Sequence, residues 1–501
     1  MPLSAAINGV LSNGQQGAGD EGSRKRAIAL ALSLGCCSSA YATGYLVQGN
    51  GDPGTGGMSL RQAITAANAG PGNIVYFDPA LNGSTITLTQ GSLLVTASTT
   101  VLGPGAAKLT VSGGGNSRIF DVSLASASIS GLKLTGGNGN GNGAGGAIIA
   151  LFGSLTLQDC VITGNTTSSA NSGAVDISSS AGPSAISGST ISGNVGGGLY
   201  TDSTLSITDT TISGNTRTGS GAGIYGNGAN LTISNSTITG NTASGDGGGI
   251  FINDSNTSNP TATLNLTDSN VSGNFAYDFG AGIDIKHAQS VSIYYSTIND
   301  NTLTDFSTSA NGGGLALQSV AGNTLVAGST VYHNFAYNSG GGIGIFDATT
   351  GNNTTIASST VVKNGTFGAA SNGILGAGGP KIRSSIIANN ANSYAATQDL
   401  AGSFNITYSL VKNASAATLS GNHNITDGTD PQLGPLTVNG GPTLTMLPIA
   451  GSPVINAGPN APGIPKDQRG LPRLVGSAAD MGAVERQVPE VIIFRNGFDP
   501  P

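Results

Sequence analysis

Short segments in which apolar and polar residues alternate recur along most of the chain. They are clear in 205–208, 231–234 and 264–267, where Leu and Ile alternate with Ser, Thr or Asn. Alternation with a period of two is typical of β-strands, because successive side chains point to opposite faces. One face of each strand is therefore expected to be aliphatic and the other polar.

These strands belong to a repeat that returns roughly every 21 to 33 residues. Each repeat combines a Thr-Ile/Val-x-x-Asn element with a small-Gly-aliphatic element. Self-similarity at this period indicates a solenoid, in which each strand bonds to its counterparts in the coils above and below. We therefore predict an all-β, single-stranded parallel β-helix of roughly 12 to 14 coils, about 60 Å long at ~4.8 Å per coil.

The Asn of the repeat is expected where the backbone turns. Asn tolerates a left-handed φ, and its amide can bond to the Asn of the next coil. We predict a structural role for this column, with variants of the element ending at Asn389 and Asn413. Its members are Asn165, Asn194, Asn215, Asn241, Asn274, Asn301, Asn334 and Asn364.

Composition supports a narrow solenoid with a largely uncharged surface. The chain has 81 Gly and no Trp, which suits tight corners and a slim interior. Charged residues make up only 9% of the chain, and 25 acidic residues exceed 18 basic ones. An acidic chain is a poor ligand for nucleic acid, so no nucleic-acid partner is expected.

The N-terminus has the three parts of a secretory signal peptide. A basic cluster, an apolar run over 27–34 and Ala40-Tyr41-Ala42 follow one another within residues 1–42. We predict export, with lipidation at Cys36 as an alternative, and no transmembrane helix in the mature chain. Cys160 takes a position filled by Ser or Thr in other repeats and is predicted to be an ordinary solenoid residue. With only three His in the chain, we predict no metal site.

A short helix is predicted before the first coils. Residues 59–68 place Leu60, Ala63, Ile64 and Ala67 on one stripe at helical spacing. An open solenoid exposes its terminal coil, so an amphipathic helix at this position is expected to cap it.

Both ends also resemble known modules. Met58-Ser-Leu-Arg-Gln-Ala-Ile64 resembles the N-terminal Cys-Ser-Leu-Arg-Glu-Ala module of exported bacterial β-helix proteins, with Met58 for Cys and Gln62 for Glu. A series of motifs that includes Asp467-Gln-Arg-Gly470 closely resembles the choice-of-anchor Q region, without the two Cys that commonly flank this motif. The repeats between them resemble those of polymorphic outer-membrane proteins.

These resemblances imply a right-handed parallel β-helix at or beyond the cell envelope, often without known activity. The last residues look like a terminal tag of exported proteins from Gram-negative bacteria, which implies that source. The predicted divisions are a signal peptide (1–42), an N-terminal cap with the first coils (43–120), β-helix repeats (121–427), the choice-of-anchor-like region (428–487) and a C-terminal tail (488–501).

One outward column is unusual when the repeats are aligned. The residue after the small-Gly-aliphatic element is Tyr200, Tyr225, Phe251 and then Asp284 in successive coils. Two residues on, and so on the same face, stand Asp202, Asn227, Asn253 and Lys286. Aromatic faces beside amides and carboxylates suit sugar binding, so we predict a ligand-binding face here. The alternative is a ladder that stabilises the solenoid without any ligand.

Candidate catalytic chemistry is weaker. Asp284, Lys286 and His287 form the richest local set of ionisable groups, but the paired-Asp and Gly-His-Gly elements of galacturonan hydrolases are missing. The predicted function is thus an exported, adhesin-like protein that contacts glycans or neighbouring surfaces, without a cofactor. A lyase or hydrolase acting on an acidic polysaccharide, with Ca²⁺ possible for the lyase, is one alternative. A rigid envelope spacer without a ligand is the other.

Overall fold

The structure is a computed structural model that describes residues 42–54, 56–140, 144–169, 171–180, 182–305, 311–367, 372–391, 398–460 and 463–487. The predicted signal peptide lies outside the described residues except for Ala42, and so does the predicted C-terminal tail. No helix within the described ranges is long and apolar enough to cross a membrane.

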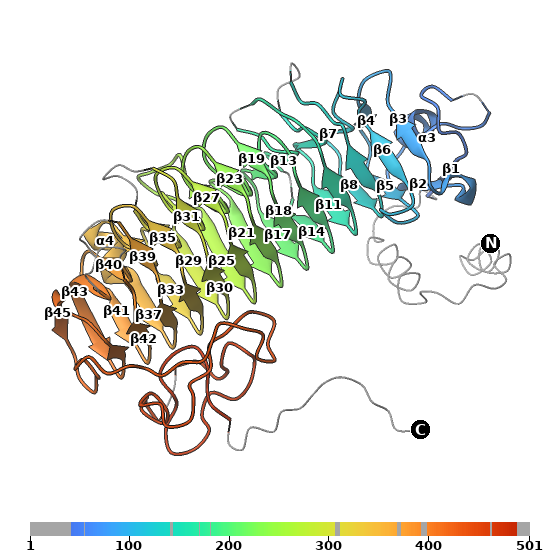
Figure 1. Ribbon diagram of the computed structural model, residues 1–501. Coiled ribbons are helices and arrows are strands. Elements are labelled where there is room, and N and C mark those ends of the chain that lie inside the picture. Colours follow the sequence, from blue (N-terminus) through green and yellow to red (C-terminus); the bar gives the residue numbers. More distant parts are fainter. Residues whose placement is uncertain are drawn as a thin grey trace, which may run out of the picture. The chain divides into compact units, whose positions relative to one another are not determined.

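The strands of the described chain stack in four parallel columns (Figure 1). One complete coil runs through β20 (Ile224–Asn227), β21 (Asn230–Ser234), β22 (Thr237–Thr239) and β23 (Thr242–Ala243) before the chain returns to the next coil. We name the columns first to fourth in this order. The third column has 13 strands, one for each coil, and this confirms the predicted all-β parallel β-helix.

The first column contains β4 (Leu93–Val95), β7 (Phe120–Ser123), β10 (Ile148–Leu151), β13 (Val175–Ser178), β16 (Leu199–Thr201), β20, β24 (Ile250–Asn253), β28 (Ile283–Ile285), β32 (Leu315–Leu317), β36 (Ile343–Ile345) and β40 (Ile374–Gly376). The second column contains β1 (Gly44–Val47), β2 (Asn73–Phe77), β5 (Thr99–Leu102), β8 (Ala127–Ser130), β11 (Leu155–Gln158), β14 (Ser184–Ser187), β17 (Leu205–Thr208), β21, β25 (Thr263–Thr267), β29 (Ser290–Tyr294), β33 (Thr324–Ala327), β37 (Thr354–Ala357) and β41 (Lys381–Arg383). The long strand β43 (Leu400–Thr407) pairs with both β40 and β41 and then with β45 (Ala416–Ser420), so the two columns join at this end.

The third column contains β3 (Thr85–Thr87), β6 (Thr110–Ser112), β9 (Lys133–Thr135), β12 (Val161–Thr163), β15 (Thr190–Ser192), β18 (Thr211–Ser213), β22, β26 (Asn270–Ser272), β30 (Thr297–Asn299), β34 (Thr330–Tyr332), β38 (Thr360–Val362), β42 (Ile386–Ala388) and β44 (Leu410–Val411). The fourth column is shorter and contains β19 (Thr216–Arg217), β23, β27 (Phe275–Ala276), β31 (Thr302–Leu303), β35 (Phe335–Ala336) and β39 (Gly365–Thr366).

The aliphatic positions of the repeat fill the interior, as their alternation predicts. Leu205, Leu231 and Leu264 pair in register across three coils, and each is at most 1% exposed. Residues of this kind form one continuous apolar cluster along the solenoid. Full burial of each such side chain contributes about 1.5–3 kcal/mol, so the stack of coils is held together mainly by this interior.

The Asn column is structural, as predicted. The backbone N–H and the side-chain amide of Asn215 both donate to Oδ1 of Asn241, over 3.1 and 2.9 Å, and the same pattern joins the other members. The left-handed residue is not the Asn itself but the residue before it, for example Gly214 (φ 60°). Our prediction for the end of the column is also wrong. The rung after Asn364 is Asn390, not Asn389, because Ile386 pairs with Thr360.

A second column of hydroxyls runs between the second and third strands of each coil. The backbone N–H of Ser236 donates to Ser269 Oγ over 3.1 Å, and the same bond recurs from coil to coil. Cys160 occupies a rung of this column, where its N–H donates to Ser189 Oγ. It is 1% exposed, and burial raises the pKa of its thiol to about 11. Cys160 is therefore an ordinary solenoid residue, as predicted.

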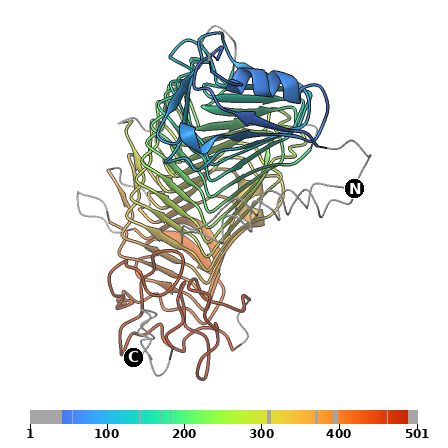
Figure 2. The same cartoon turned by 90° about the vertical axis from the view of Figure 1, so that its right-hand side faces the viewer.

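The predicted capping helix is α3 (Leu60–Ala67). Its buried residues are the four of the predicted stripe, and Figure 2 shows the helix lying across the end of the stack. Ser59 caps it: Ser59 Oγ accepts from the Gln62 N–H, and Gln62 Oε1 accepts from the Ser59 N–H. Gln62 therefore completes a capping box, the role that Glu also takes at this position of a helix.

Residues 428–460 and 463–487 pack against the outer face of the third column, where they form irregular loops (Figure 1). The fully buried Gln468 is the centre of this contact. Its Nε2 donates to Thr297 Oγ1 and Thr443 Oγ1, each over 2.9 Å, and its Oε1 accepts from Thr330 Oγ1 over 2.6 Å.

Apolar contacts complete this junction. Val362 and Ile386 of the third column form one cluster with Met446, Val454 and Met481. The short helix α4 (Ala348–Asn353) lies elsewhere, in the turn between β36 and β37.

Candidate functional site

The predicted outward column exists in the fold. Tyr200 pairs in register with Tyr225, Tyr225 with Phe251, and Phe251 with Asp284, all on the first column. The ring centroids of Tyr200 and Tyr225 are 5.3 Å apart, and those of Tyr225 and Phe251 are 5.1 Å apart. The alignment of repeats therefore predicts this side-chain column correctly.

The rings of this column are covered, however. Tyr200 is 6% and Phe251 5% exposed, and Tyr225 is half-buried with the Arg217 guanidinium 5.0 Å from its ring centroid. An open ring face for a sugar is thus absent at Tyr200 and Phe251. The contacts of these rings are those of a stabilising ladder, which was the alternative considered for them.

The cover is the turn that brings the chain back from the fourth column. A Cβ on Gly221 would lie 2.7 Å from Tyr225 Cβ, and one on Gly247 would lie 2.7 Å from Phe251 Cβ. Both glycines also have positive φ, 75° and 60°. Glycine is therefore required in these turns by both space and conformation, and its absence of a side chain lets the turn lie directly against the Cβ atoms of Tyr225 and Phe251.

The positions two residues further on are more open. Asp202, Asn227 and Asn253 are half-buried, and the side chain of Lys286 is 45% exposed. Asn227 Nδ2 donates to the Tyr200 hydroxyl over 3.4 Å, which links this polar row to the covered rings. The accessible groups of the predicted face are therefore amides, a carboxylate and the ammonium of Lys286.

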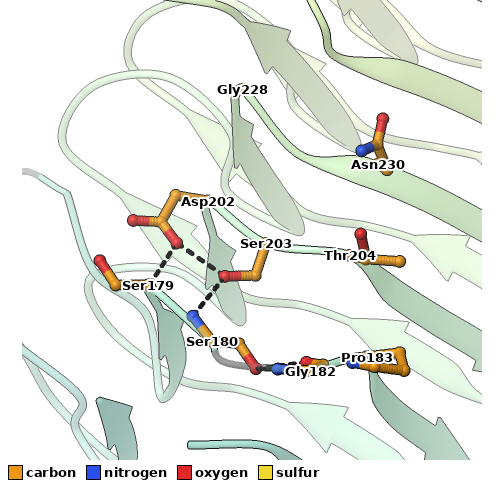
Figure 3. A pocket seen from close by; sticks show the side chains of 9 residues that line it. All are labelled: Ser179, Ser180, Gly182, Pro183, Asp202, Ser203, Thr204, Gly228 and Asn230. Carbon is orange, nitrogen blue, oxygen red and sulfur yellow. Dashed lines mark hydrogen bonds between the residues drawn. The ribbon is translucent and has the colours of Figure 1, made fainter. Parts of the chain in front are cut away.

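A cleft of about 470 Å³ lies where this row meets the turns between first and second strands (Figure 3). It is lined by Ser179, Ser180, Gly182, Pro183, Asp202, Ser203, Thr204, Gly228 and Asn230. Asp202 Oδ1 accepts from the Ser179 N–H over 2.6 Å and from Ser203 Oγ over 2.8 Å. The polar side chains that line the cleft are mainly hydroxyls, from Ser179, Ser180, Ser203 and Thr204.

The turns near this cleft differ in length. The turns after β16 and β20 are short, 202–204 and 228–229, and residues of both line the cleft. The turn after β24 is longer, 254–262, and Asp254 orders it by accepting from the N–H groups of Asn256, Thr261 and Ala262. Burial raises the pKa of Asp254, but these bonds outweigh it and hold the pKa below its usual range.

Two buried charged groups lie beneath the same face. Asp176 pairs with Tyr200 from the preceding coil and is fully buried. Burial raises the pKa of its carboxyl to about 6. Arg217 is 5% exposed and donates to the Ser172 carbonyl over 2.8 Å, and burial lowers the pKa of its guanidinium to about 10. Arg217 was not identified from the sequence. The signal was an arginine at a position of the fourth column where the neighbouring coil has Ala243.

The charges of two catalytic candidates, Asp284 and Lys286, act on each other, but no contact joins the three candidates into one site. Asp284 is fully buried and accepts from Gln318 Nε2 over 2.9 and 3.0 Å, and burial raises the pKa of its carboxyl well above the usual range. Lys286 Nζ lies 3.9 Å from Asp246 Oδ2. Among the described residues, no hydrogen bond or ion pair joins His287 to Asp284 or Lys286. Within the same ranges, no group of three His, Cys, Asp or Glu is arranged to hold a metal ion.

The comparisons with known proteins concern the fold. Residues 110–298 match the family model described as right handed beta helix region. The fold is a right-handed parallel β-helix. No curated protein matches the sequence. Three chains of solved structure match, and one is entitled "Crystal structure of pectate lyase Pel9A", with 16% identity, 89% of this chain and 97% of that chain covered, and a TM-score of 0.35. A TM-score this low carries no information on activity.

Proposed function

We propose that this β-helix is an exported protein that binds polysaccharide on its side, at the surface of or outside a Gram-negative cell, without cleaving it. The observation that carries the proposal is the polar row of Asp202, Asn227 and Asn253 beside the hydroxyl-lined cleft. Amides, hydroxyls and a carboxylate at one-coil spacing, ~4.8 Å, offer regular donors and acceptors to a hydroxyl-rich chain.

Binding rather than cleavage is favoured by the state of the acidic groups. A general acid or base needs hydrogen-bond reach to a substrate atom. Asp284 is instead buried and occupied by Gln318, and Lys286 lies beside Asp246. The polar row contributes one carboxylate, Asp202, and both the Ser179 N–H and the Ser203 hydroxyl donate to it.

Export is favoured by the leader-like N-terminus and by the uncharged polar surface. If residues 1–42 are a cleaved signal peptide, the mature chain begins at Thr43. Cell fractionation with mass analysis of the purified protein tests this. An intact Met1 in a cytosolic fraction would contradict export.

Affinity electrophoresis through gels that contain neutral or acidic polysaccharides tests the binding. We expect retardation by at least one polysaccharide, and at least a tenfold weaker affinity for an Asp202→Asn, Asn227→Ala variant. The matched control is Thr232→Ala, Asn265→Ala, two exposed positions on the second column. Equal retardation of both variants would contradict binding at the cleft.

The same gels are assayed for cleavage. Polysaccharide breakdown that Lys286→Ala abolishes would establish the lyase or hydrolase instead. If there is neither retardation nor cleavage, the remaining alternative is an envelope spacer without a ligand.

A further inference from the structure

A second group of aromatic side chains lies on the outer face of the fourth column. The tetrapeptide Asn-Phe-Ala-Tyr occurs twice, at 274–277 and at 334–337. In both copies the Ala is buried, and the Phe and Tyr before and after it belong to the opposite face. We call Phe275, Tyr277, Phe335, Tyr337 and Phe367 the aromatic patch.

Three members of the patch are more exposed than the rings of the first column, whereas Phe335 and Tyr337 are half-buried. Phe275 is 39%, Tyr277 47% and Phe367 37% exposed. The rings of Phe335 and Phe367 meet edge to face with centroids 4.6 Å apart, and the Tyr337 ring lies 5.7 Å from that of Phe367. Exposed aromatic side chains that cluster in this way are typical of binding surfaces.

A cleft of about 440 Å³ adjoins the patch and shares Phe335 with it. Its lining consists of Asp300, Thr302, His333, Asn334, Phe335, Lys363, Gly365 and Ala391. Thr302 and Gly365 pair with Phe335 from the two neighbouring coils, so the cleft extends over consecutive turns of the solenoid.

The charged residues of this cleft occupy strained positions. In five earlier coils the residue before the column Asn is glycine, with φ between 59° and 64°. These are Gly164, Gly193, Gly214, Gly240 and Gly273. At the cleft the same position holds Asp300 (φ 56°), His333 (φ 53°) and Lys363 (φ 58°). A side chain in the left-handed region is unfavourable, and the turn between the second and third strands also holds one in several coils, for example at Asp209, Asn235 and Tyr295.

The charges of the cleft leave one cation available. His333 Nδ1 lies 2.6 Å from Asp300 Oδ1, and both side chains are well exposed. The ammonium of Lys363 has no carboxylate partner among the described residues and lies 5.8 Å from the Tyr332 ring centroid. An ammonium beside aromatic rings fits a sugar that carries a carboxylate, because C–H faces of the sugar pack on rings while the carboxylate pairs with the cation.

We propose that this cleft and the aromatic patch form a second saccharide site, which takes the uronate units of an acidic polysaccharide. The carboxylate of one unit contacts Lys363, and sugar faces pack on Phe335 and Phe367. The site lies on a different column from the cleft at Asp202, so it is independent of the function proposed above.

Titration of the full chain with oligogalacturonate and with its methyl ester tests this proposal. We expect the free acid to bind at least tenfold more tightly than the ester, and this difference to shrink as salt is added. Lys363→Gly is expected to remove the difference while raising the denaturation midpoint, because it restores the glycine of earlier coils. A loss of binding in a more stable protein cannot be attributed to misfolding.

Two control variants distinguish this site from nonspecific charge attraction and from the cleft at Asp202. Lys381→Met removes one exposed lysine from the second column and is expected to leave oligogalacturonate binding unchanged. The Asp202→Asn, Asn227→Ala variant is also expected to bind it normally. Equal affinity for acid and ester, equal losses in Lys363→Gly and Lys381→Met, or no binding of oligogalacturonate at all would each overturn the proposal.

Discussion

The molecule contains two aromatic groups built on the same coil spacing, one covered and one open. Tyr200, Tyr225 and Phe251 lie on the first column beneath glycine-containing turns, whereas the aromatic patch lies on the outer side of the fourth column. Regular spacing of aromatic residues therefore does not by itself identify a binding face in a solenoid. Whether a turn covers the aromatic side chains decides whether they stabilise the fold or are open to a ligand.

The largest difference between the two groups is expected in stability. Phe251→Ala should lower the free energy of unfolding by about 3–4 kcal/mol, because it leaves a cavity under the turn at Gly247. Denaturant titration followed by circular dichroism measures this. A loss below about 1 kcal/mol would mean that the turn does not hold the ring.

A second difference concerns pH. The folded pKa of Asp176, about 6, lies above its ordinary value of 3.8, so the folded state holds this proton more tightly than the unfolded state. This contribution to stability is complete below about pH 4 and is lost as the pH rises through about 6. Asp176→Asn should flatten that slope and stabilise the protein at pH 7.5, on the order of 2 kcal/mol. Asp209→Asn, at an exposed position, is the control, and an equal effect of both would contradict the assignment.

His333→Gly tests the cost of the left-handed conformation at the open site. Restoring glycine at a left-handed position should stabilise the protein by about 1 kcal/mol, since a side chain there costs roughly 1–2 kcal/mol. Thermal denaturation measures the gain. Gly214→His, the reverse exchange in an earlier coil, should destabilise by a similar amount. Stabilisation by both exchanges would show that the left-handed strain is not the cause.

The smallest effect is expected at the open patch itself. Phe275→Thr copies Thr302 of the paired coil and should change the free energy of unfolding by no more than about 0.5 kcal/mol. The same denaturant titration applies. A loss as large as that of Phe251→Ala would mean that the patch belongs to the packed structure and is not a recognition surface.

Much of the fold could be predicted because its signals are periodic. The alternation of Leu231 and Ile233 with polar residues, the Asn column and the stripe of α3 each follow from spacing along the sequence. The cover over Phe251 could not be predicted in this way. Strands of two residues, such as β23, are too short to show alternation, and the turn that follows is recognisable only by its glycine.

The open site was missed for a related reason. Aligning the repeats on the small-Gly-aliphatic element emphasises the first column, whereas both copies of Asn-Phe-Ala-Tyr begin at a column Asn, Asn274 and Asn334. Replacement of Gly273 by Asp300 at the next coil is also visible in the sequence, once the left-handed position is known to precede the Asn. The position of Gln468 depends on contacts with strands far away in the chain, and no local pattern reveals these.

Gln468 contacts strands that lie far earlier in the chain, so the packing of the last coils is completed late during synthesis. Its side-chain amide bonds to the carbonyl of Ser296, 172 residues earlier. A ribosome that adds about 5–20 residues per second needs roughly 10–30 s to cover that interval. Meanwhile Val362 and Ile386 become part of a formed coil whose outer face still meets water. A prematurely terminated chain would keep this apolar surface, and cellular quality control could recognise the unfinished molecule by it.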